Sequence, residues 1–171
     1  MGLIQKTAAI VLTAIMVLTI TTTLVVGTTA LVMEQSSNNI EFTAKIASFN
    51  ETNRNGTRIM PGAFSQVGIV NIPVFLDHIH ERKAQIGALL FIEVRADGIY
   101  ARGKLNLDKL PAIERQLVLE GLMNSVSVGY IIKKSYTDAA GATVVQQMDL
   151  IETSLVGIPA DPKARILSIK K

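Results

Sequence analysis

Two short stretches carry residue types that suit nucleophilic catalysis. Asp77-His78 follows the apolar run 70–76, and Ser127-Val128-Gly129-Tyr130 lies inside another apolar run. A serine hydroxyl is a weak nucleophile until a neighbouring base takes its proton, and a histidine that titrates near neutrality suits that task. These stretches therefore make a serine hydrolase one candidate function.

Glu152 is the candidate third member of such a site. It lies in the apolar run 148–156, where a carboxylate needs a partner, and a histidine is a good one. Each residue also has a structural interpretation: Ser127 as a strand serine that faces solvent, His78 as a loop histidine, and Glu152 as an outward residue opposite a lysine. Residue types alone leave both interpretations open, although the lack of a GxSxG motif argues against an α/β-hydrolase.

The chain contains no cysteine and two histidines, His78 and His80. The missing cysteine excludes disulfides, thiolate metal sites and cysteine nucleophiles. On a strand, residues two apart face the same side, so the histidines could begin a metal site. No third ligand lies nearby in sequence, so we expect no metal and no cofactor.

The composition fits one domain of modest size. The net charge is only +3, the basic residues are scattered, aromatic residues make up 5% of the chain, and tryptophan is absent. These features argue against nucleic-acid binding, which usually needs a basic stripe or aromatic stacking platforms.

Residues 7–33 carry no charged side chain. As a helix they would extend about 40 Å, more than the ~30 Å hydrocarbon core of a bilayer, which predicts a transmembrane anchor. A cleaved signal peptide is one alternative. A propeptide or assembly segment is another, because the stretch is rich in Thr, Val and Ile. The polar run 34–39 reads as a linker, so we predict an N-terminal segment over 1–39 and a domain over 40–171.

The domain is predicted to be of the α+β class: β-rich and barrel-like, with one or two helices. The helix is expected over Asp108–Leu122, with Asp108 as its cap, Pro111 in its first turn and Gly121 near its end. Its predicted buried stripe is Leu110, Ile113, Leu117 and Leu122. The predicted strands are 41–49, 70–76, 86–94, 99–105, 126–132, 144–156 and 165–169.

An ordered set of short motifs spans residues 41–169. The set resembles the prohead serine proteases of tailed phages. Its members are Pro61-Gly62-Ala63-Phe64, the strand that ends at His78, Ile86-Gly87, the hairpin from Gly98 to Leu105, Ser127 to Tyr130, Glu152 to Val156 with Pro159-Ala160, and Ala164 to Ile166.

The resemblance implies a fold similar to that of the herpesvirus capsid-maturation protease. It also implies Ser127 as nucleophile, a histidine as general base, and Glu152 in the third position, which the herpesvirus enzymes fill with histidine. Ser125 is a poorer candidate because no Val-Gly-Tyr follows it. His78 is preferred because it ends a strand, while His80 remains a rival when the loop is counted back from Ile86-Gly87.

The resemblance further implies an endopeptidase that cuts phage scaffold and major capsid proteins, and itself, inside the prohead that assembles in the host cytoplasm. The herpesvirus relatives dimerise, so the resemblance makes a homo-oligomer one expectation and leaves a monomer open. If residues 7–33 span a bilayer, the chain is instead membrane-anchored. The alternative function is a membrane-tethered, catalytically inactive β-domain that serves as a binding or assembly module.

Overall fold

The computed structural model describes residues 24–25, 28–29 and 38–170. Two short antiparallel strands, β1 (Leu24–Val25) and β2 (Thr28–Thr29), belong to one compact unit, and the other unit is Ser37–Lys171. Apart from those four strand residues, the predicted anchor over 7–33 lies outside the described residues. In the described part of the chain, no helix is both long and apolar enough to cross a bilayer.

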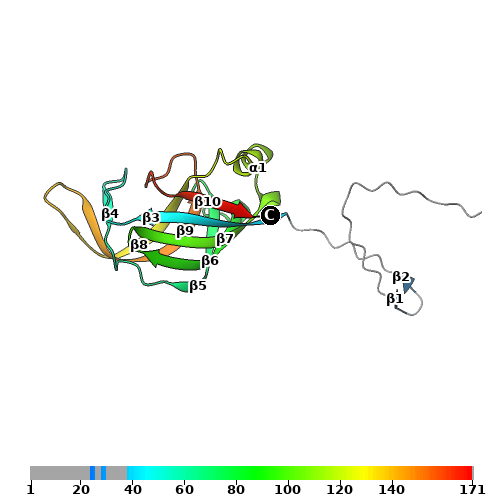
Figure 1. Cartoon of the computed structure of the whole chain (residues 1–171), viewed down its shortest axis with the longest axis horizontal. Coiled ribbons are helices and arrows are strands. Elements are labelled where there is room, and N and C mark those ends of the chain that lie inside the picture. The colour runs from blue at the N-terminus through cyan, green and yellow to red at the C-terminus, as the bar shows by residue number, and fades with distance from the viewer. Residues whose placement is uncertain (1–23, 26–27, 30–37, 171) are drawn as a thin grey trace, which may run out of the picture. The chain divides into compact units, whose positions relative to one another are not determined.

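The second unit is dominated by one eight-stranded sheet (Figure 1). Its order is β10-β3-β7-β6-β5-β9-β4, and β8 also pairs with β9. The strands are β3 (Asn39–Ser48), β4 (Thr57–Ile59), β5 (Gly68–Leu76), β6 (Gln85–Arg95), β7 (Gly98–Asn106), β8 (Val126–Thr137), β9 (Thr143–Leu155) and β10 (Arg165–Lys170).

The strands form because apolar residues alternate with polar ones. In β3, Ile40, Phe42 and Ala44 are buried, which places one face of the strand against the core. At the end of β9 this alternation stops, and four consecutive residues from 152 to 155 are all buried. Polar side chains in that stretch therefore need partners inside the protein, which makes the end of β9 a natural place for a functional site.

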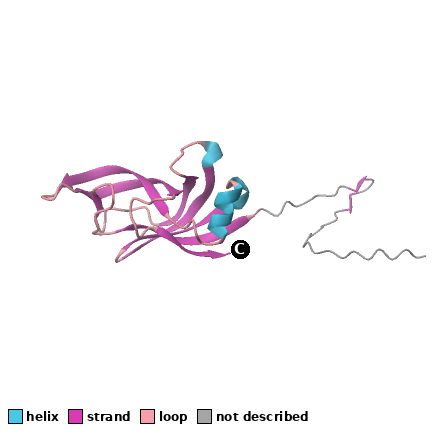
Figure 2. Ribbon diagram, turned by 90° about the horizontal axis from the view of Figure 1, so that it is seen from above, coloured by secondary structure: helices cyan, strands magenta, loops and turns pink. Residues whose placement is uncertain are grey.

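The sheet is curved (Figure 2). The chain just before β8 pairs with the start of β10. Ser125 forms an isolated antiparallel bridge with Arg165. The Val126 amide donates to the Ala164 carbonyl over 3.2 Å, and the Ile166 amide donates to the Asn124 carbonyl over 2.7 Å. The fold is thus a curved, β-rich sheet with a single α-helix in the described residues, as the sequence led us to expect in outline.

Each predicted strand corresponds to an observed one, with ends that differ by up to about five residues. Alternation and turn residues explain this agreement: Ala96-Asp97 joins β6 to β7, and residues 138–142 join β8 to β9. β4 was not predicted. It has three residues and pairs in parallel with β9, far away in sequence, so no local pattern indicates it.

The predicted helix over Asp108–Leu122 is wrong in its length, cap and buried face. A 3₁₀ turn, η2 (Leu107–Lys109), comes first, and the α-helix α1 spans only Ala112–Leu119. Asn106, rather than Asp108, caps the 3₁₀ turn, and α1 begins after Pro111 without a side-chain cap.

The buried side chain of α1 is Val118. Two members of the predicted stripe, Ile113 and Leu122, are 73% and 71% exposed. Leu110 is buried but precedes the helix, because Pro111 separates the 3₁₀ turn from α1. α1 ends at Leu119 rather than Leu122, but the predicted role of Gly121 in ending the helix is confirmed: Gly121 has a φ of 74°, and its amide donates to the Val118 carbonyl.

Candidate active site

Strand β9 lies between β8 and β5 and brings the three predicted site residues together. Ser127 on β8 lies opposite Ser154 on β9, and Gly129 lies opposite Glu152. Ser127 and Glu152 are therefore diagonal neighbours on one face, about 7–8 Å apart by strand geometry. On the other side of β9, β5 runs parallel to it and ends at Leu76, two residues before His78.

His78 sits in a tight turn that follows β5. Asp77 and His78 both have left-handed backbones, with φ values of 51° and 57°. Such conformations cost about 1–2 kcal/mol for residues other than glycine and concentrate at functional sites. β9 holds this turn in place: the Asp77 amide donates to the Leu155 carbonyl over 3.0 Å, and the His78 amide donates to Ser154 Oγ over 3.2 Å.

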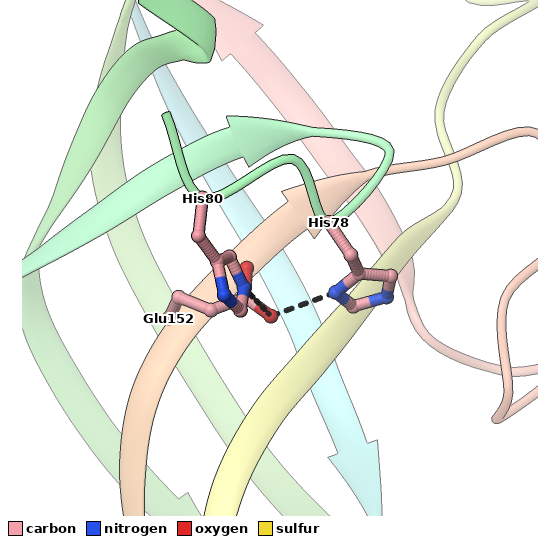
Figure 3. A group of neighbouring side chains, drawn as sticks. All are labelled: His78, His80 and Glu152. Atoms are coloured by element: carbon pink, nitrogen blue, oxygen red, sulfur yellow. Dashed lines mark hydrogen bonds and ion pairs between the residues drawn. The ribbon is translucent and has the colours of Figure 1, made fainter. Parts of the chain in front are cut away.

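The His78 ring is fixed by a buried carboxylate. His78 Nδ1 lies 2.7 Å from Glu152 Oε1, and the Glu152 side chain is only 2% exposed (Figure 3). The other carboxylate oxygen, Oε2, accepts a hydrogen bond from Ser154 Oγ over 2.6 Å. Glu152 thus occupies one ring nitrogen of His78 and leaves Nε2 for other chemistry, as in a triad whose carboxylate selects the tautomer of the base.

Gly129 makes room for that carboxylate. A Cβ built on Gly129 would lie 2.9 Å from Glu152 Cγ and 3.0 Å from Glu152 Cδ, closer than real Cβ contacts allow. Any side chain at position 129 would therefore displace Glu152. The glycine of the Ser-Val-Gly-Tyr stretch admits the side chain of the neighbouring strand, an arrangement that the sequence does not reveal.

Ser127, His78, His80 and Glu152 line one cavity of about 240 Å³. Ser127 is only 6% exposed, so its access to a ligand is through this cavity. Among the residues that the structure describes, no hydrogen bond joins Ser127 to His78. Catalytic hydrogen bonds often tighten only when substrate binds, so a shared cavity is the relevant observation here.

His80 is a second imidazole beside the same carboxylate. Its Nε2 lies 3.9 Å from Glu152 Oε1, beyond hydrogen-bond range, and its ring packs at 50° to that of Phe75. Ligand atoms of His78, His80 and Glu152 all lie within 4.8 Å of one another. The expectation that no third ligand accompanies the histidines holds only along the sequence, because in space β9 supplies one.

Tyr130 also lines the cavity. Burial raises the pKa of its phenol, and a hydrogen bond with Thr57 opposes that shift. The phenol therefore stays neutral at physiological pH and offers a hydrogen-bonding group at the wall of the cavity.

Residues 28–171 match the model of a family described as the caudovirus prohead serine protease. The chain belongs to this family. Prohead serine proteases are serine peptidases, which is the enzyme class that Ser127 and its neighbours indicate. No protein with a curated description matches the chain.

The fold is similar to that of a herpesvirus protease, the KSHV protease, whose crystal structure contains a hexapeptide phosphonate inhibitor. The TM-score is 0.50 and the sequence identity is 10%. The match covers 78% of this chain and 65% of the KSHV chain, so this chain spans slightly less than two thirds of that structure's length.

The sequence indicated three residues that the structure gathers at one cavity, but it did not indicate how they are held. The structure brings Ser127, His78 and Glu152 together, and it also places His80 beside Glu152. Ser125 is joined to Arg165 in a strand bridge and does not line the cavity. Ser154 was missed, although its spacing of two from Glu152 puts both side chains on one face of a strand.

Proposed function

We propose that the chain is the serine endopeptidase of phage head maturation, with Ser127 as nucleophile, His78 as general base and Glu152 as the group that orients the base. The observation that carries this proposal is the 2.7 Å contact between His78 Nδ1 and Glu152 Oε1 in the cavity that Ser127 lines. Membership of the prohead serine protease family supports it.

The proposed mechanism follows from the hydrogen bonds. With its Nδ1 proton directed at Glu152, the neutral His78 ring carries a lone pair on Nε2. Nε2 accepts the Ser127 proton as Oγ attacks the peptide carbonyl, and it later returns that proton to the departing amine. Glu152 keeps the ring in this tautomer and stabilises the imidazolium that forms in between.

The proposed substrates are the scaffold and major capsid proteins inside the assembling prohead in the host cytoplasm, together with the chain's own N-terminal region. Self-cleavage in or near the linker 34–39 would release the domain 40–171. An apolar segment over 7–33 would then act as a propeptide or, if it stays attached, as a membrane anchor. Fractionation of cells that express the Ser127→Ala chain tests the anchor, because a fully soluble protein contradicts it.

A serine-reactive fluorophosphonate tests the nucleophile without knowledge of the substrate. We expect the full chain to be labelled once, at Ser127, and labelling to disappear in Ser127→Ala. Ser125→Ala is the matched control, because Ser125 precedes the same strand but lies outside the cavity. Equal labelling of wild type and Ser127→Ala would refute the assignment.

Co-expression with the scaffold and capsid proteins of the same phage tests the activity. Wild type and Ser125→Ala should shorten these proteins, and mass spectrometry should locate the cut, whereas Ser127→Ala should leave them intact. If wild type and Ser127→Ala behave alike, with no cleavage and no labelling, the protease proposal is refuted and the alternative of an inactive β-domain is favoured.

A further inference from the structure

We propose that His78, His80 and Glu152 form a binding site for Zn²⁺ and that an ion bound there inhibits the protease. The three residues offer two imidazole nitrogens and one carboxylate oxygen, all within 4.8 Å of one another. This donor set is typical of open zinc sites, in which three protein ligands leave a position for water.

The distances suit such an ion. Ligands about 2.1 Å from a tetrahedral zinc lie about 3.4 Å from each other. Glu152 Oε1 is 2.7 Å from His78 Nδ1 and 3.9 Å from His80 Nε2, so the two spacings bracket the required one (Figure 3). Small rotations of the two rings would equalise them.

The surroundings favour a cation at this place. The Glu152 side chain is 2% exposed, whereas those of His78 and His80 are 40% and 55% exposed. An ion can therefore enter from the histidine side and reach a carboxylate with few other partners. Ser154 holds Oε2, which leaves Oε1 directed toward both imidazoles. Imidazole ligands select zinc over magnesium, so Mg²⁺ should not compete.

Zinc at this site would block the proposed chemistry directly. A metal on His78 Nδ1 uses the lone pair of that nitrogen, so the neutral ring carries its proton on Nε2. Nε2 is then a donor and cannot accept the Ser127 proton. This inhibitory effect rests on the proposed function, whereas metal binding does not.

Two variants isolate the site. The chain has two histidines and no cysteine, so any imidazole-dependent metal binding must involve this pair, provided that no polyhistidine tag is present. His80→Phe removes one ligand and keeps a ring against Phe75. Asp149→Asn removes another carboxylate of β9, one that pairs with Lys133, and serves as the control.

Binding is measured in the full chain carrying Ser127→Ala, so that it is independent of activity. Calorimetry with Zn²⁺ should give one ion per chain, and Co²⁺ should produce visible d–d absorption. Adding His80→Phe should weaken Zn²⁺ binding at least tenfold, whereas adding Asp149→Asn should not. Zn²⁺ affinity that is unchanged by His80→Phe, or the absence of binding at millimolar Zn²⁺, overturns the proposal.

Inhibition is measured with the fluorophosphonate in the otherwise unmodified chain. Zn²⁺ should slow labelling, a chelator should restore it, and Mg²⁺ should have no effect. The labelling rate of each chain is divided by the rate of the same chain without metal. The Zn²⁺ concentration that halves this relative rate should be at least tenfold higher for the His80→Phe chain than for wild type. Binding in the Ser127→Ala chain without any labelling of wild type would refute the proposed protease and leave the metal site standing.

Discussion

Replacing Glu152 with glutamine tests the orientation of the base, because it removes the charge and preserves the shape. Ser154 Oγ accepts from the His78 amide and donates to Glu152 Oε2, so its hydrogen needs an acceptor at that position. The glutamine oxygen should therefore face Ser154, and its NH₂ group should face His78 Nδ1. An N–H at that place requires the lone pair of Nδ1, which moves the ring proton to Nε2 and disables the base.

The cost of turning the amide limits the expected loss. Changing the carboxylate of a serine-protease triad to an amide lowers kcat by about 10⁴, through the same tautomer error. Here the opposite amide orientation would restore the tautomer but strand the Ser154 hydroxyl, at a cost of about 1–3 kcal/mol. A chain that turns the amide at that cost keeps a working base, so we expect kcat to fall on the order of 10–100-fold.

Two measurements check this prediction. The first is hydrolysis of a peptide copied from the mapped cleavage site, which should show a lower kcat at nearly unchanged KM. The second is the rate of fluorophosphonate labelling. Asp149→Asn is the control, since Asp149 is a half-exposed carboxylate on the same strand. A kcat loss below tenfold for Glu152→Gln would refute the orienting role.

A double variant sharpens the test. In Glu152→Gln with Ser154→Ala, no hydroxyl constrains the amide, so its oxygen can turn toward His78 Nδ1. The double variant should therefore lose no more activity than Glu152→Gln alone, although each single change is harmful. Losses that simply add would mean that Ser154 does not set the orientation of residue 152.

Three further predictions concern the supports of the site and a distant turn. Gly129→Ala should lower kcat at least about 100-fold, because its Cβ displaces Glu152 and catalysis is sensitive to a misplacement of about 1 Å. Gly157→Ala is the control in thermal melting, since a Cβ at that position meets nothing within 4 Å. Ser154→Ala should lower the free energy of unfolding in urea by about 1–3 kcal/mol, because it leaves Glu152 Oε2 unpaired. The pKa of Asp138 is lowered from 3.8 by hydrogen bonds from the Ala142 and Ala140 amides and by its interactions with Arg58. Its stabilising effect is thus present above the unfolded pKa and lost as pH falls through the folded one. Asp138→Asn should therefore destabilise the chain in urea at pH 7, and the difference from wild type should shrink as the pH falls below the ordinary value of 3.8.

The strands could be predicted because their signals are local. Alternation and turn residues fix β5, β6 and β7 to within a few residues. The bounds and the buried face of the helix could not be predicted, because its apolar residues fit more than one stripe. Its start also depends on the 3₁₀ turn before Pro111. β4 could not be predicted because these three residues form a strand only through pairing with β9, which lies far away in sequence.

In the candidate site, too, the sequence indicated the residues themselves but not the contacts between strands that hold them. The order of motifs indicated Ser127, His78 and Glu152, which the fold brings to one cavity. The contacts that hold them cross from strand to strand: the Glu152 side chain lies over Gly129, and Ser154 lies beneath the His78 turn. Such contacts depend on register, which a single sequence does not specify.

The carboxylate of Glu152 links the proposed catalysis to the proposed metal binding. A base of this kind needs a buried acceptor at Nδ1, and burial leaves that acceptor with few partners of its own. One imidazole satisfies the requirement, but the chain places a second one 3.9 Å from the same oxygen. Two imidazoles that share one buried carboxylate oxygen cannot both hydrogen-bond to it at their present spacing, whereas both can bind an ion that lies between them. Under the two proposals, the arrangement that prepares His78 to act as a base also prepares the site for inhibition by zinc, and the His80→Phe chain separates the two properties.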